Sequence, residues 1–332
     1  MVIYNGLDAV GLEPRPRVLA VGAFDGVHRG HQRLLGHVCR TGAEYGIESA
    51  IMTFEPIPAQ VFRQRGADGM RLTVRDERER ELARQCVDIA VVTDFNQEFR
   101  DLRAEDFARE ILVRRLGVVA LVASKTHTFG RNAEADVQRI AELGMELGFE
   151  VHVLPPILVD GQRINSTDLR NRLWAGDVEG AADWLGRPYD MAGEVVSGRG
   201  VGRQLGFPTA NLQPHAEKLI PADGVYACAA RVEGEPGQEA VWRPAAVSIG
   251  HTPTLGDGGR LVEAHFLESP EAELAGATVR VLFLRHLRDQ ERFADTGALS
   301  AQIARDVQTT REVYALDAPT FCGLGCPVEG QE

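Results

Sequence analysis

Residues 18–37 read VLAVGAFDGVHRGHQRLLGH, and this stretch decides how the first half of the chain is organised. A short apolar run is followed by a turn-like segment rich in glycine, by two histidines, His28 and His31, and by apolar residues at helical spacing. This order predicts a buried strand, a tight loop and a helix that begins near Gly30. The unpaired N–H groups of that helix and the positive end of its dipole would face the loop.

A corner of this kind is suited to hold phosphate. Gly22 and Gly30 let the backbone approach an anion closely, and the imidazoles of His28 and His31 can donate hydrogen bonds to phosphate oxygens. The alternative is an ordinary strand-to-helix turn with two solvent-exposed histidines. Because glycines, the acid Asp25 and paired histidines coincide at the end of a strand, the phosphate site is favoured.

Length, composition and charge set the limits for the whole chain. Its 332 residues suffice for two domains, and 44% hydrophobic and 25% charged residues are typical of a globular protein. A formal net charge of −12 without a basic block argues against a nucleic-acid or membrane partner. Neither a run of about 18 apolar residues nor a signal-peptide pattern is present, so we expect a cytoplasmic protein.

The cysteines are few and scattered. Their odd number, five in a long chain, favours reduced thiols over a disulfide framework. Cys322 and Cys326 have no further ligands nearby, which favours an incidental pair over a zinc site.

Strand-like and helix-like segments alternate up to residue 154, which indicates a doubly wound parallel sheet. A further helical segment ends at Gly186 and Pro188, the predicted domain boundary, so that the first domain covers residues 1–186. The expected strands are 18–21, 49–53, 88–92, 118–122 and 151–154, and the expected helices are 75–85, 104–116, 133–147 and 174–189.

The hydrophobic period changes after this boundary. Short runs rich in Val, Ala and aromatic residues, without helices between them, predict an antiparallel barrel over residues 187–315, covered by a final helix at 298–314. Residues 316–332 are expected to form a flexible tail. The expected barrel strands are 191–196, 224–232, 241–249, 260–267 and 278–284.

The second dense motif is SGRGVGRQLGFPTANL at residues 197–212. Its glycine-rich loop offers N–H groups to phosphate, and Thr209 and Asn211 offer oxygen ligands to Mg²⁺. Glycine-rich loops alone are weak signals, and the alternative is a mobile β-hairpin loop.

GAFDGVHRGH resembles the GxFDGVHxGH signature of bacterial bifunctional riboflavin kinase/FMN adenylyltransferases, also called FAD synthetases, within the HxGH nucleotidyltransferase superfamily. RINSTDLRNRL, at 163–173, resembles the family's R-x-S-S-T-x-x-R. The resemblance implies that His28, His31 and Arg170 act on the ATP phosphates. It also implies nucleotide contacts at Gly22, Phe24, Asp25, Gly30, Phe129, Arg163, Ser166 and Thr167.

The second half follows the order of riboflavin kinase motifs through IPADGVY, SIGHTPT and VEAHFLE. The resemblance implies a six-stranded barrel, Mg²⁺ at Thr209 and Asn211, and Glu263 as the base for the ribityl 5′-hydroxyl. Taken alone, Glu263 would be an ordinary exposed strand residue. The implied ATP contacts are Gly198, Gly200, Gly202, Arg203, Pro208, Thr209 and Asn211, with Val201 where the family commonly has a basic residue.

The resemblance covers residues 15–315 and implies two reactions, both with Mg²⁺. Riboflavin and ATP would give FMN and ADP in the barrel, and FMN and ATP would give FAD and pyrophosphate at the sheet. The implied partners are these small molecules alone, and a homo-oligomer could form.

Two segments in the first domain depart from the family pattern. Ile57 replaces the histidine of FxPHP, and Thr126 and His127 replace the asparagine and the aromatic residue of GxNFxFG. An apolar side chain cannot donate to phosphate. Two alternatives therefore stay open: a first domain specialised for another nucleotide or acceptor, or a non-catalytic scaffold or flavin-binding module beside a working kinase.

Overall fold

The computed structural model describes residues 1–62, 70–159, 161–197, 207–234, 241–251, 260–268 and 274–321. Contacts between Cα atoms divide the chain into two compact units, Met1–Ser166 and Thr167–Glu332. The domain limits expected at residues 186 and 315 stay predictions.

A six-stranded sheet forms the centre of the first unit, and every neighbouring pair of its strands is parallel. This confirms the doubly wound sheet predicted from the alternating pattern; the N-terminal edge strand was not predicted. In spatial order the strands are β1 (Val2–Asn5), β4 (Ile89–Thr93), β3 (Glu48–Phe54), β2 (Arg17–Val21), β5 (Val118–Ser124) and β8 (Glu150–Leu154).

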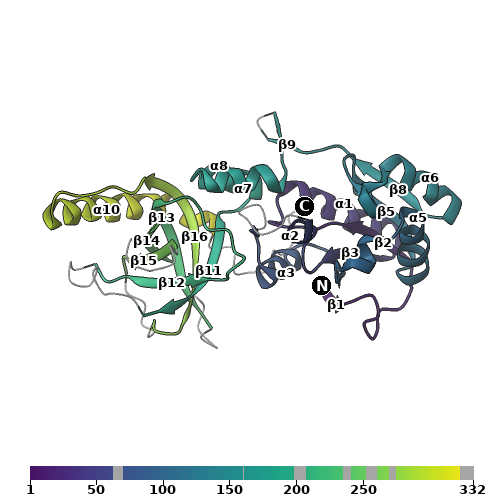
Figure 1. The fold of residues 1–332 in the computed structure, drawn as a ribbon, viewed down its shortest axis with the longest axis horizontal. Coiled ribbons are helices and arrows are strands. Elements are labelled where there is room, and N and C mark those ends of the chain that lie inside the picture. The colour runs from purple at the N-terminus through teal and green to yellow at the C-terminus, as the bar shows by residue number, and fades with distance from the viewer. Residues whose placement is uncertain are drawn as a thin grey trace. The chain divides into compact units, whose positions relative to one another are not determined.

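Helices cover both faces of this sheet (Figure 1). In β2, Val18 and Ala20 join the apolar cluster beneath the first helix, whereas Leu19 and Val21 join the cluster on the opposite face. Burial on both faces explains why the strand is apolar without interruption. One face carries α1 (Arg29–Tyr45) and α3 (Arg75–Ala83); the other carries α5 (Ala104–Asp106), the π-helical η2 (Phe107–Arg115) and α6 (Val137–Leu147).

Helix α6 begins four residues later than the predicted helix 133–147. Asn132 and Ala133 have positive φ angles of 54° and 56°, which a right-handed helix cannot accommodate. Asp136 then caps the helix by accepting a hydrogen bond from the N–H of Arg139 at 2.9 Å. The shorter elements of this unit are α2 (Pro58–Phe62), α4 (Gln97–Arg100), β6 (Thr128–Phe129), η3 (Arg131–Ala133), β7 (Ala135–Asp136), β9 (Leu158–Val159) and β10 (Gln162–Arg163).

The strand order places the candidate site. It reverses between β2 and β5, the point at which ligands bind in open α/β sheets, outside the carboxyl ends of the strands. The histidine-bearing loop leaves the end of β2, and the segment that contains Thr126 and His127 leaves the end of β5.

A closed six-stranded barrel forms the centre of the second unit, and all its strand pairs are antiparallel. This confirms the predicted barrel; β12 was not among the strands expected from the pattern. Around the barrel the strands are β11 (Tyr189–Val196), β12 (Ala210–Pro214), β15 (Arg260–Phe266), β14 (Arg243–His251), β13 (Gly224–Glu233) and β16 (Thr278–Arg288), preceded by α7 (Ser166–Trp174) and α8 (Val178–Leu185).

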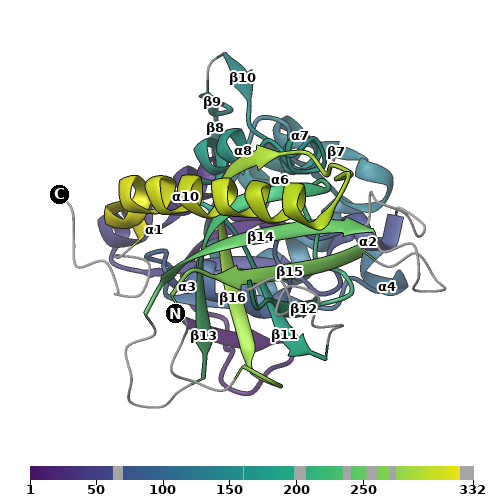
Figure 2. The same cartoon turned by 90° about the vertical axis from the view of Figure 1, so that its left-hand side faces the viewer.

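Helix α10 (Thr296–Phe321) lies across the outside of the barrel, over β14 in Figure 2. Val313 is buried against residues of β13 and β16, and the Tyr314 hydroxyl donates to the carbonyl of Trp242 at 2.6 Å. The helix continues past its expected end at residue 314 and past residue 316, where the tail was expected to begin. The Cys322/Cys326 pair lies outside the described residues.

One expectation is wrong: Cys39 and Cys86 form a disulfide, with Cα atoms 6.0 Å apart. Counting cysteines could not show this, because the pairing depends on α1 and the end of α3 packing on the same face of the sheet. A Cα separation of this size is common for bridged cysteines. Cys228 is a buried free thiol.

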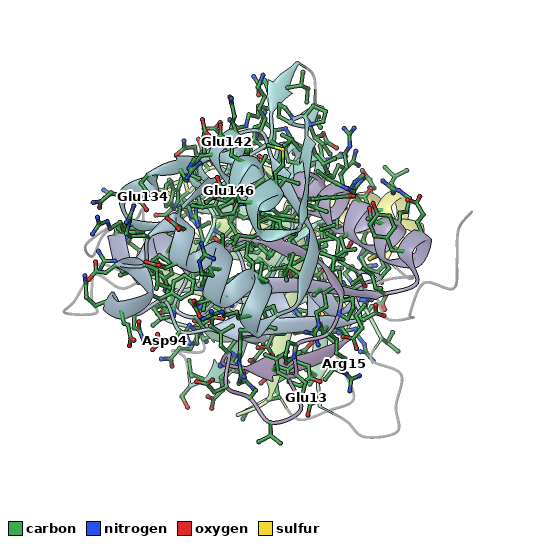
Figure 3. All side chains as sticks on the ribbon, turned by 90° about the vertical axis from the view of Figure 1, so that its right-hand side faces the viewer. Glu13, Arg15, Asp94, Glu134, Glu142 and Glu146 are labelled. Atoms are coloured by element: carbon green, nitrogen blue, oxygen red, sulfur yellow. A yellow bond between two sulfur atoms is a disulfide. The ribbon has the colours of Figure 1, made fainter. Side chains whose placement is uncertain are left out.

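Charged side chains, including Glu134, Glu142 and Glu146, stand out from the surface of the first unit (Figure 3). No helix in the described ranges is both long and apolar enough to cross a bilayer.

Candidate functional site: two connected cavities and a barrel face

The loop after β2 ends at His28, which caps the first turn of α1. The Nδ1 atom of His28 accepts a hydrogen bond from the backbone N–H of His31 at 3.2 Å. Since Nδ1 is an acceptor, a neutral His28 carries its proton on Nε2, which makes that atom a donor. The helix begins at Arg29, so His31 lies in its first turn and not in the loop as expected.

The two imidazoles are stacked, with ring centroids 3.7 Å apart and an angle of 14° between the rings. The stack requires glycine at position 30, because a Cβ atom there would lie 2.9 Å from Cε1 of His28. Phe24 supports the stack from one side with its ring edge-on to His31, 5.3 Å between centroids. The two histidines therefore form one ordered unit at the helix N-terminus.

Burial and neighbouring imidazoles keep the His31 ring neutral. Desolvation, followed by the charges of His28 and His127, lowers the pKa of His31 well below its ordinary value of 6.5. Burial also lowers the pKa of His127. Among the described residues, the Nδ1 atoms of His31 and His127 are buried and have no hydrogen-bond partner. These nitrogen atoms are expected to find partners in a ligand.

Asp25 fixes the shape of the loop. Its buried carboxylate accepts hydrogen bonds from the backbone N–H groups of Leu72 at 3.2 Å and Thr73 at 3.0 Å. Phe24 and Val27 on either side have positive φ angles of 49° and 41°, a conformation that side chains other than glycine adopt only where the surroundings enforce it. Asp25 lines neither cavity described below, so its observed contacts are structural.

A buried ion cluster supports the same loop from below. Glu55 accepts hydrogen bonds from Arg71 at 2.6 and 3.0 Å and from Arg78 at 2.8 Å, and Arg78 also donates to the carbonyl of Ala23 at 3.1 Å. Burial and the neighbouring Arg71 lower the pKa of Arg78 to about 10. Glu55 therefore links two buried guanidinium groups next to the loop.

A polar cavity of about 250 Å³ opens at the helix N-terminus. Arg163 reaches it from the far side and donates to the hydroxyl of Thr126 at 2.6 Å, while the Ser166 hydroxyl donates to the carbonyl of Asp25 at 3.0 Å. The cavity thus brings together seven of the predicted site residues, Gly22, Phe24, His28, Gly30, His31, Arg163 and Ser166.

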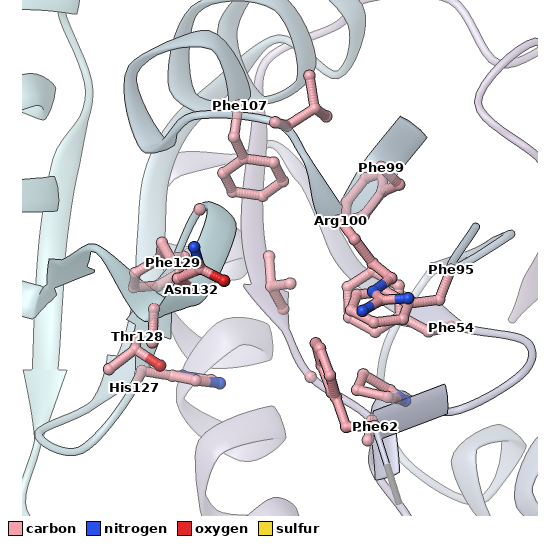
Figure 4. Close-up of a pocket in the computed structure, with 17 residues that line it drawn as sticks. Phe54, Phe62, Phe95, Phe99, Arg100, Phe107, His127, Thr128, Phe129 and Asn132 are labelled. Carbon is pink, nitrogen blue, oxygen red and sulfur yellow. The ribbon is translucent and has the colours of Figure 1, made fainter. Parts of the chain in front are cut away.

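A larger aromatic cavity of about 460 Å³ lies beside the polar one. Figure 4 shows Phe129, Asn132 and His127 on one side of it, with Phe54, Phe95 and Arg100 on the other. Of the predicted site residues it contains Gly22 and Phe129. The sequence analysis missed its remaining phenylalanines, although the positions of Phe54 at the end of β3 and Phe95 just after β4 were a usable signal. These phenylalanines are Phe54, Phe62, Phe95, Phe99 and Phe107.

The two cavities meet at the strand-order reversal. Both are lined by Val21, Gly22 and Ala23 from the end of β2 and by His127 from the segment after β5. Ile57 lines neither cavity and is only 1% exposed, so it is part of the core and not of the site. Of the two segments that depart from the family pattern, the one with Ile57 thus places that residue in the core, whereas the one with His127 lines the cavities.

Thr167 and Arg170 belong to α7, beyond the division between the two units. Thr167 is exposed and Arg170 is buried. Their assignment to the nucleotide stays a prediction.

The barrel presents a row of polar residues on adjacent strands. Asn211 of β12 pairs with Glu263 of β15, which pairs with Ser248 of β14. Asn211 is buried and Glu263 is half-buried, and burial raises the pKa of the Glu263 carboxyl. The flanking Val262 and Ala264 point into the barrel.

The imidazole of His265 contacts the residues just before β12. His265 donates from Nδ1 to the carbonyl of Pro208 at 2.9 Å and contacts the ring of Phe207 edge-on, 5.5 Å between centroids. Half-buried Thr209 follows directly. Gly198, Gly200, Val201, Gly202 and Arg203 lie outside the described residues.

Comparisons with known proteins agree with both halves of this geometry. A family model described as FAD synthetase matches residues 12–168, and one described as riboflavin kinase matches residues 185–314. Bifunctional riboflavin kinase/FMN adenylyltransferases of Pseudomonas fluorescens and Escherichia coli K12 are 36% and 35% identical to the chain. The matches cover 96% of this chain and 99% and 100% of those proteins.

A solved structure has the same fold over nearly the whole chain. It is a Streptococcus pneumoniae protein described as a macrolide-efflux protein, with a TM-score of 0.83 and 27% identity, covering 94% of this chain and 99% of that one.

A chain that joins an FAD synthetase domain to a riboflavin kinase domain is a two-domain transferase that acts on flavins. This chain belongs to the bifunctional riboflavin kinase/FMN adenylyltransferase family. It is an enzyme with both activities, which confirms the function expected from the motifs and does not favour the two alternatives for the first domain.

Proposed function

We propose that FMN and ATP occupy the two cavities of the first unit and react where these meet. The aromatic cavity offers phenylalanine faces to the flavin ring, and the polar cavity offers the α1 N-terminus and imidazole donors to the ATP phosphates. The observation that carries the proposal is the shared wall of the two cavities at the strand-order reversal.

In the proposed reaction, an oxygen of the FMN phosphate attacks the α-phosphorus of ATP, and the bond to pyrophosphate breaks. His28, through Nε2–H, and His31 donate hydrogen bonds to the transferring group and stabilise the charge that develops on it. Because both rings are held in place before ATP arrives, little reorganisation is needed during the reaction.

In the barrel, we propose that Glu263 takes the proton of the ribityl 5′-hydroxyl as that oxygen attacks the γ-phosphorus of ATP, with release of ADP. A raised pKa makes this carboxylate a stronger base. The hydroxyl of Thr209 and the amide oxygen of Asn211 are hard oxygen donors that fit Mg²⁺, which would neutralise phosphate charge when bound. Gly198, Gly200, Gly202 and Arg203 are proposed to contact ATP, as the motif implies.

We further propose a cytoplasmic location and, as a second proposal, a homo-oligomer. In the cytoplasm, the Cys39–Cys86 disulfide would exchange with the reducing thiol pool.

Two parallel assays test the proposed function. Purified protein is supplied with FMN and ATP, and FAD and pyrophosphate are measured; riboflavin and ATP are then supplied, and FMN is measured. His31→Ala should lower FAD formation by roughly 10²-fold or more and leave the kinase rate unchanged. Glu263→Gln should lower FMN formation by about 10²- to 10⁴-fold, whereas Glu268→Gln, an exposed glutamate just beyond the same strand, serves as the matched control. Full FAD formation by His31→Ala, or full kinase turnover by Glu263→Gln, would overturn the corresponding assignment.

A further inference from the structure

His127 is the polar side chain that lines both cavities of the first unit; the other shared residues, Val21, Gly22 and Ala23, have no polar side chain. A ligand group that extends from the aromatic cavity towards the polar cavity must pass this imidazole. In FMN, the group at the end of the ribityl chain is the phosphate that attacks ATP.

The surroundings of His127 hold its ring in place but leave one of its nitrogen atoms without a hydrogen bond. Its backbone N–H donates to the carbonyl of Ser124 at 2.9 Å, and its ring lies against Phe129 with 5.5 Å between centroids. The buried Nδ1 atom has no hydrogen-bond partner among the described residues. A buried nitrogen of this kind is costly unless a ligand satisfies it.

The imidazoles of His28 and His31 line the polar cavity only. His28 caps α1 and stacks on His31, and neither ring lines the aromatic cavity. His127 is close enough to His31 for its charge to lower the pKa of that ring. The described part of the site therefore contains two imidazoles on the ATP side and a third at the junction.

We propose that His127 is an acceptor-binding residue that donates a hydrogen bond to the phosphate of FMN and directs it towards the α-phosphorus of ATP. This inference rests on the proposed function and adds a residue to it. It also gives a role to the departure from the family pattern at this position, where an imidazole that lines both cavities stands in place of an aromatic residue.

The test measures FAD formation by the full-length chain with FMN and ATP varied separately. His127→Phe retains ring packing but removes the donor, and it should raise the KM for FMN about tenfold or more while the KM for ATP stays within about twofold. His127→Gln, which keeps a donor, should restore much of the affinity. His152→Phe is the matched control, because His152 is a half-buried histidine of the same unit that lines neither cavity.

Lumiflavin separates binding of the ring from binding of the phosphate, since it has the flavin ring but no phosphate and no ribityl hydroxyl for the kinase. Its inhibition constant for FAD formation should be the same in wild type and His127→Phe. An unchanged KM for FMN, an equal rise in the KM for ATP, or an equal loss of lumiflavin affinity would each overturn the role of His127. A wild-type protein that makes no FAD would instead overturn the proposed function itself, and an unchanged thermal transition followed by circular dichroism shows that each variant is folded.

Discussion

Replacing Glu55 with glutamine tests whether the buried ion cluster holds the histidine-bearing loop. The side chains of Arg71 and Arg78 are 2% and 0% exposed, and Glu55 is the carboxylate that the structure places between them. Glutamine keeps the size of the side chain but removes the charge that Arg71 and Arg78 share. Removing one partner of a buried ion pair costs about 3 to 5 kcal/mol, and because Glu55 is partly exposed we take the lower figure, ~3 kcal/mol.

This loss corresponds to a fall of roughly 6 to 12 °C in the transition of a domain of this size. Each unit has its own readout, so the temperature at which adenylyl transfer is lost should fall while that of kinase activity does not. Glu110→Gln is the matched control, because its ion pair with Arg114 has a similar length, 2.9 Å, but both side chains are exposed. Such surface pairs contribute about 0 to 1 kcal/mol.

The pH dependence of stability gives a second readout of the same cluster. Burial raises the pKa of Glu55, but the hydrogen bond and charge of Arg71 and the charge of Arg78 outweigh it and hold the pKa below its ordinary value of 4.5. A depressed folded-state pKa contributes stability above the unfolded pKa, and this contribution is lost as the pH falls through the folded pKa. In Glu55→Gln, the free energy of unfolding should therefore fall less steeply as the pH drops into the acid range. Equal transitions for Glu55→Gln and Glu110→Gln would refute the reasoning.

Three further predictions follow from single contacts. Arg100 lies 4.8 Å above the centre of the Phe62 ring, so Arg100→Ala should weaken FMN binding for adenylyl transfer roughly two- to fivefold, measured as KM. Burial raises the pKa of Glu263, so kcat of the kinase should fall as the pH drops through that raised value, and an acid limb at the position of an ordinary glutamate would contradict this. Cys39→Ser should lower the stability of the first unit by about 2 to 4 kcal/mol under oxidising conditions, with no effect after reduction, as followed by denaturant unfolding.

The sequence was sufficient for the features that depend on local pattern. The apolar run of β2, buried on both faces, predicted a parallel strand, and the following glycines and histidines predicted a helix that starts within about two residues of its observed N-terminus. The residues of the polar cavity could also be predicted, because they lie close together along the loop or match a motif.

Features that depend on the packing of distant segments could not be predicted. The aromatic cavity joins Phe54, Phe95 and Phe129 from three different strand ends. The disulfide joins Cys39 of α1 to Cys86, which follows α3 and lies 47 residues further along the chain. The sequence also could not show that the Asp25 carboxylate accepts a hydrogen bond from the backbone of Thr73. Ile57 could not be recognised as a core residue, because an apolar side chain in a loop gives no sign of which way it faces.

The reversal of strand order between β2 and β5 has a consequence for how such an enzyme can diverge. Residues that line the cavities, such as Thr126 and His127, come after the last hydrogen-bonded pair of their strand, so exchanging them leaves the sheet and both apolar layers intact. Substitutions at a few loop positions can therefore change the substrate preference without changing the fold. Residues 126–128 are accordingly the positions to vary when the enzyme is engineered towards altered flavin phosphates.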